Sequence, residues 1–120
     1  MPLRRMCAAL IVAAFLVGPG PALAHAILVA SQPRISGTVA PGPVSIEFRF
    51  NSRIDHARSR LSLVRPDHSQ SVLPIVPDSA EDVLAASTEL SPGAYTIKWQ
   101  VLAVDGHITR GDVPFMVSDH

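Results

Sequence analysis

The sequence is poor in cysteine, in aromatic side chains and in net charge. Its 120 residues include a single cysteine, Cys7, and only 5% are aromatic. One cysteine excludes a disulfide within the chain and any cysteine-rich metal site. Lys and Arg together number 10, as do Asp and Glu, so the formal net charge is zero. A balanced charge argues against a nucleic-acid-binding protein, which normally carries a basic surplus.

Recognisable catalytic motifs are missing as well. The chain contains neither a Gly-x-Ser-x-Gly nucleophile motif nor a glycine-rich phosphate loop. Its carboxylates are scattered through expected turns, and no pair of them suggests acid–base catalysis. We therefore expect that the protein is not an enzyme.

A run long enough to span a bilayer is also lacking. The uncharged apolar segment at residues 6–17 is shorter than the roughly 20 residues that a membrane helix needs. Arg4 and Arg5 precede it, and a Gly-Pro-Gly-Pro break and the small-residue sequence Ala-Leu-Ala follow it. This order is typical of a secretory signal peptide, so we expect cleavage after residue 24, with an uncleaved anchor as the alternative. The domain left at residues 25–120 would contain no cysteine and no membrane span.

That domain reads as a series of short strands separated by turns. Apolar and polar residues alternate with a period of two over residues 44–50, 95–101 and 113–117, and shorter candidates lie at 27–31, 61–63 and 72–76. Prolines and glycines separate these runs. The pattern predicts an all-β sandwich of about seven strands, with Phe48, Trp99 and Phe115 in its core. Residues 78–84 are the one helical candidate, with Ser79 as its cap.

Two features contain donors for a metal ion. Cleavage after Ala24 would make His25 the first residue, and a terminal histidine offers its α-amine and its Nδ1 to the same ion. The unperturbed pKa values of these groups, ~7.7–8.0 and ~6.5, let both lose a proton near neutral pH. The second feature is Asp105-Gly106-His107. Residues i and i+2 of an extended chain point to the same side, and Gly106 allows the backbone to turn.

Together, His25, Asp105 and His107 would supply three nitrogens and one oxygen. A tetragonal set of this kind suits Cu(II), which also leads the affinity series of the divalent metals. Zn(II) accepts the same donors but prefers a tetrahedron. The residues thus favour one Cu(II) ion per chain, although an Asp-Gly-His sequence is also compatible with an ordinary turn that carries a solvated histidine.

The remaining histidines and methionines point to no further site. His56, His68 and His120 match no ligand position, and we interpret them as solvated loop residues. Met116 is the one methionine left after residue 24. Because a single thioether cannot form a cluster for a soft ion, we expect no methionine-rich Cu(I) site, and we place Met116 in ordinary packing or on the surface.

The two ends of the expected domain carry a family pattern. Residues 25–33 fit His-Ala-x-Leu-x-x-Ser-x-Pro, and residues 99–117 fit Trp-x-Val-x-x-x-Asp-Gly-His-x-x-x-Gly-x-x-x-Phe-x-Val. Gly37, Pro43 and the strand at 44–48 follow in the same order. In these features the sequence resembles the CopC-type copper-resistance proteins. It departs from them at Ala103, where the family commonly has a serine.

The resemblance implies a Greek-key β-sandwich, Ig-like or cupredoxin-like, that binds one Cu(II) in the periplasm for copper homeostasis or resistance. It implies the copper ligands His25, Asp105 and His107, and an inner-membrane CopD-type copper permease as a partner. Two other functions stay open. One is a copper-dependent oxidative enzyme, since lytic polysaccharide monooxygenases share the terminal-histidine chelate. The other is a metal-free secreted interaction domain.

Overall fold

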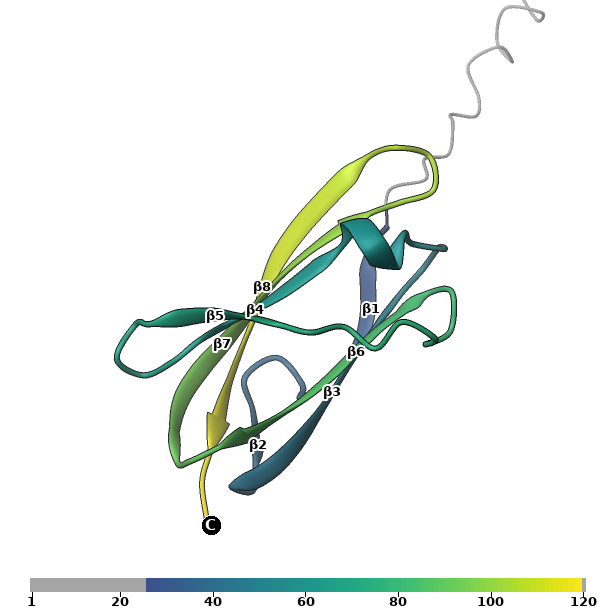
Figure 1. Ribbon diagram of the computed structural model, residues 1–120. Helices are drawn as coiled ribbons and strands as arrows, with labels where there is room; N and C mark the ends of the chain where they lie inside the picture. The colour runs from purple at the N-terminus through teal and green to yellow at the C-terminus, as the bar shows by residue number, and fades with distance from the viewer. Residues whose placement is uncertain (1–25, 120) are drawn as a thin grey trace, which may run out of the picture.

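Residues 26–119 are described by a computed structural model, and they form eight strands in two sheets (Figure 1). One sheet has the strand order β1-β3-β6, and the other has the order β2-β8-β7-β4-β5. The all-β sandwich predicted from the sequence is confirmed. Among these residues no helix is long and apolar enough to cross a membrane. The strands are β1 (Leu28–Gln32), β2 (Gly37–Val39), β3 (Gly42–Phe50), β4 (Arg60–Val64), β5 (Gln70–Leu73), β6 (Val83–Leu90), β7 (Gly93–Leu102) and β8 (Ile108–Val117), with one 3₁₀ turn, η1 (His56–Arg58).

The period-two pattern decides which face of each long strand is buried. In β3 the apolar residues at alternate positions from Val44 to Phe50 are buried, and the polar residues between them are exposed. In β7 the buried positions are the odd-numbered residues from Tyr95 to Val101. The segments predicted at 44–50 and 95–101 are therefore strands. The segment predicted at 113–117 is the end of a longer strand, because β8 already begins at Ile108.

The predicted helix at residues 78–84 is wrong. Residues 74–82 form an irregular connection with turns, and the chain enters β6 at Val83. Leu, Ala and Glu in this stretch have good helix propensity, but tertiary pairing overrides it. Every residue of β6 pairs with β3, and Leu84 lies opposite Phe48 with no exposed surface. Burial of that side chain in the sandwich outweighs the weak local preference.

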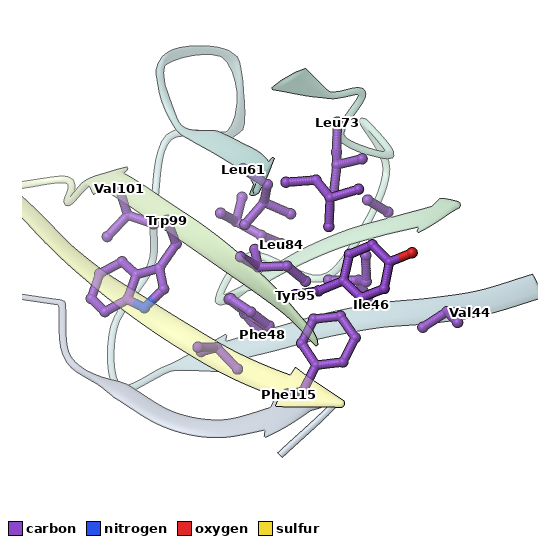
Figure 2. Packing of buried hydrophobic residues seen from close by; sticks show 14 of the residues in the cluster. Val44, Ile46, Phe48, Leu61, Leu73, Leu84, Tyr95, Trp99, Val101 and Phe115 are labelled. Carbon is purple, nitrogen blue, oxygen red and sulfur yellow. The ribbon is translucent and has the colours of Figure 1, made fainter. Parts of the chain in front are cut away.

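The core lies between the two sheets and contains the aromatic residues that the alternation placed there (Figure 2). Phe48, Trp99 and Phe115 are 0%, 9% and 3% exposed, so all three are buried as predicted. Phe50 meets Trp99 edge to face at 5.2 Å between ring centroids, and Tyr95 stacks on Phe115 at 5.8 Å. Such pairs add to the stabilisation that comes from apolar burial alone.

Hydrogen bonds within the loop fix the turn between β4 and β5. The hydroxyl and the amide of Ser69 both donate to Oδ1 of Asp67, at 2.7 and 2.9 Å. These bonds favour the ionised carboxylate and lower the pKa of Asp67 below its ordinary 3.8. His68 occupies the next position with a φ of 72° and is exposed, as expected for a loop histidine.

Gly111 is required where β8 passes the indole of Trp99. The two residues are opposite each other in the β7–β8 pairing, and a Cβ added at position 111 would lie 2.5 Å from Trp99 Cζ2. No real Cβ makes such a contact, so a side chain here would push a core ring out of its packed position.

We expect Gly111→Ala to lower the free energy of unfolding by about 1–3 kcal/mol, the usual cost of overpacking a core. Urea unfolding followed through the fluorescence of Trp99, the chain's one tryptophan, measures this change. Asp112→Ala alters the adjacent exposed residue and serves as the control, with an expected change within about 0.5 kcal/mol. Equal stability of the two variants would contradict the packing argument.

Candidate metal centre

Five residues, 103–107, connect β7 to β8, and Val104, Asp105 and Gly106 form the tip of this loop. The amide of Ala103 donates to the carbonyl of His107, and the amide of Gly106 donates to the carbonyl of Ala103, both at 2.9 Å. Gly106 has a φ of 90°, a conformation that glycine adopts without steric cost. A tight turn followed by a glycine at positive φ is a common three-residue hairpin connection. These bonds hold Asp105 and His107 at the tip of the hairpin.

The carboxylate of Asp105 makes two polar contacts with His107, one to its backbone amide and one to its imidazole. Oδ1 of Asp105 accepts from the backbone amide of His107, and Oδ2 lies 3.0 Å from its Nδ1. The two side chains are 27% and 61% exposed, respectively. The structure therefore brings together a carboxylate and an imidazole, the two donor types predicted for this loop, and leaves them accessible at the surface.

His25, the third residue predicted to bind the metal, lies outside the described residues, which begin at Ala26. Ala26 is 1% exposed, and its carbonyl accepts a hydrogen bond of 2.8 Å from the hydroxyl of Thr109. The amide of Ile27 donates to Oδ1 of Asn51 at 2.8 Å, and the amide of Asn51 donates to the carbonyl of Ile27 at 3.0 Å. The start of the described chain is thus bonded to β8 two residues beyond His107.

Within residues 26–119, no three His, Cys, Asp or Glu side chains come close enough together to hold a metal ion. Among these residues, Asp105 and His107 are a pair of candidate donors.

The other histidines fall into different environments. The interpretation of His56 as a solvated loop residue is wrong, because its Nε2 lies 2.7 Å from the carbonyl of Val83 and its side chain is half-buried. This bond ties η1 to the start of β6, an association that only the folded sandwich creates. His120 lies outside the described residues. Met116 is 46% exposed on β8, in keeping with a surface position.

Sequence reasoning did not identify Thr109 and Asn51, which hold the residues next to His25. Thr109 lies 83 residues from Ala26 along the chain. A threonine in a strand carries no signal of a carbonyl partner so far away. Asn51 directly follows the alternating segment 44–50, which marks the end of a strand but not the bond that its side chain makes.

Solved structures share this fold. CopC from Methylosinus trichosporium OB3b superposes with a TM-score of 0.69 at 28% identity, over 78% of this chain and 94% of that one. PcoC, a methionine-rich copper resistance protein from Escherichia coli, superposes with a TM-score of 0.66 at 24% identity, over 79% of this chain and 100% of that one. Methionine is scarce here by contrast, with three among 120 residues.

Sequence comparisons point the same way. Protein YobA of Escherichia coli K12 is 30% identical over 98 residues, which cover 78% of this chain and 79% of YobA. The family model of the CopC domain matches residues 28–118, a span that includes every strand of the sandwich together with Asp105 and His107. The chain therefore belongs to the CopC family.

Proposed function

We propose that this protein is exported to the periplasm and there binds one Cu(II) ion per chain, which it sequesters or delivers. The ligands would be His25, through its amine and Nδ1, together with Asp105 and His107. One observation carries the proposal: the residue that follows His25 is hydrogen-bonded to Thr109, two positions beyond His107. An amino-terminal donor and the hairpin pair therefore belong to the same end of the domain.

The chemistry of the donors favours Cu(II). A dication beside Asp105 gains favourable Coulomb energy from the carboxylate, and imidazole and amine nitrogens bind copper more strongly than other divalent metals of the series. The amide of His107 donates to Oδ1 of Asp105, which holds the carboxylate against its neighbouring imidazole. Supporting hydrogen bonds of this kind orient metal ligands before the ion binds. Membership of the CopC family supports copper as the cargo.

The enzyme alternative has less support. Trp99, the residue that could supply a flat aromatic surface for a polysaccharide, is instead 9% exposed and packed against Phe50. We propose that the protein hands its ion to a partner rather than using it in catalysis. A CopD-type permease of the inner membrane is the partner we propose for delivery.

The free amine of His25 can be tested by blocking it. The exported protein, with its first residue established by intact mass, should bind one equivalent of Cu(II) and give a tetragonal, nitrogen-rich EPR spectrum. Acetylation of the α-amine of His25 should lower the affinity on the order of a hundredfold, because the resulting amide is no longer a donor and the imidazole of this residue loses its linked partner. Acetylation confined to Lys98, the one lysine of the chain, is the control. Equal affinity of the two acetylated proteins would exclude the amine as a ligand.

The imidazole of His107 can be tested against a second exposed histidine. His107→Ala should lower the Cu(II) affinity by at least about tenfold, since loss of even a group that supports a ligand has that effect. It should also remove one nitrogen coupling from the EPR spectrum. His68→Ala, in the β4–β5 turn, should change neither quantity. If both variants bind copper like the unaltered protein, His107 is not a ligand.

A further inference from the structure

We propose that Thr109 and Asn51 are positioning residues of the copper site, which fix the backbone beside His25 before the ion binds. This inference rests on the proposed function, because it treats His25 as a donor. It adds two side chains that do not contact the metal and assigns them the task of holding the terminal donor near Asp105 and His107.

The argument begins with a single peptide unit. The carbonyl of Ala26 and the amide of Ile27 belong to the same planar group. Thr109 donates to that carbonyl at 2.8 Å, and Oδ1 of Asn51 accepts from that amide at 2.8 Å. Both polar ends of the plane are therefore bonded, so the plane can neither rotate nor shift without breaking a hydrogen bond.

The two bonds come from opposite layers of the sandwich. Thr109 lies on β8 in the five-stranded sheet, and Asn51 directly follows β3 in the three-stranded sheet. Figure 1 shows the chain entering β1 at the end of the molecule where the β7–β8 loop lies. The plane between residues 26 and 27 is thus held from both sides, at the end of the domain that presents Asp105 and His107.

This degree of order is unusual for a position that precedes the first strand. The ends of a domain are poorly ordered unless something ties them down. Here β1 begins only at Leu28, yet Ala26 is 1% exposed and the backbone of Asn51 adds a third hydrogen bond to Ile27. Since His25 is joined to Ala26 by one peptide bond, few rotatable bonds separate the held plane from the amine and imidazole of His25.

Holding this plane should increase affinity by removing an ordering cost. Fixing the backbone of one residue is entropically unfavourable, and a protein that has already fixed it does not lose that freedom again on binding. Thr109 is suited to the task because a β-branched side chain has few χ1 rotamers, which keeps the hydroxyl directed at the carbonyl. The hydroxyl, rather than the bulk of the side chain, is the group that matters.

The experiment compares Thr109→Val with Thr109→Ser in protein that has been exported and processed. Valine keeps the shape and removes the hydroxyl, and we expect it to lower the Cu(II) affinity about tenfold in competition with a chelator. Serine keeps the hydroxyl and should restore most of that affinity. Thr96→Val is the matched control, because Thr96 is also half-buried in the five-stranded sheet and its side chain makes no hydrogen bond within residues 26–119.

Asn51→Ala tests the other end of the plane. It should speed hydrogen exchange of the Ile27 amide in the metal-free protein, leave core amides such as that of Leu63 unchanged, and weaken Cu(II) binding. A copper affinity equal to that of the unaltered protein would remove Asn51 from the positioning role.

A double-variant cycle separates positioning from general stabilisation. If Thr109 acts through the terminal donor, Thr109→Val should have a much smaller effect in the protein whose His25 α-amine is acetylated. An undiminished effect there, or equal loss in the valine and serine variants, would overturn the inference. Copper binding by the unaltered protein that is indifferent to Thr109→Val would overturn it too and leave the proposed function standing. No copper binding at all would overturn the proposed function itself.

Discussion

The pairing of β7 with β8 is the constraint on which the rest of the molecule depends. It joins every residue from Gly93 to Leu102 with a partner from Ile108 to Val117, so both strands share one register. On the inner face this register sets Trp99 against Gly111 and Tyr95 against Phe115. At its closed end it leaves five residues, 103–107, for the loop that carries Asp105 and His107. The same ladder therefore fixes the core and the candidate donors, and a slip of one residue would move both.

The remaining strands complete the sandwich around this hairpin and bring the beginning of the chain to its tip. β4 continues the sheet beside β7, and β2 pairs with the last residues of β8. Within residues 26–119, one edge of the first part of β8 therefore has no strand partner. Ala26 lies against that part of β8 through the hydroxyl of Thr109. At this edge the chain near Ala26 is joined to β8 by the side-chain hydrogen bond from Thr109.

Features that depend on a few neighbouring residues can be predicted from this sequence. Contacts between segments that are far apart in the chain cannot. Alternation located β3, β7 and the end of β8, and Asp105-Gly106-His107 marked the hairpin loop, because each depends on neighbours in the chain. The helix expected at residues 78–84 was wrong because burial of Leu84 opposite Phe48 is decided by a distant strand. The partners of His56 and Thr109 were missed for the same reason, since both bonds join segments that are far apart in sequence.

The relation between core and candidate site bears on how such a protein would handle its metal. A structural metal ion supplies much of the free energy of folding, so the domain unfolds when the ion is removed. Here the apolar core of the sandwich contains neither Asp105 nor His107, and both side chains are accessible at the hairpin loop. An ion bound there could be gained or lost while β7 and β8 remain paired. This separation fits the proposed role of the protein as a copper carrier, because release of the ion would then require changes at the proposed ligands but not in the core.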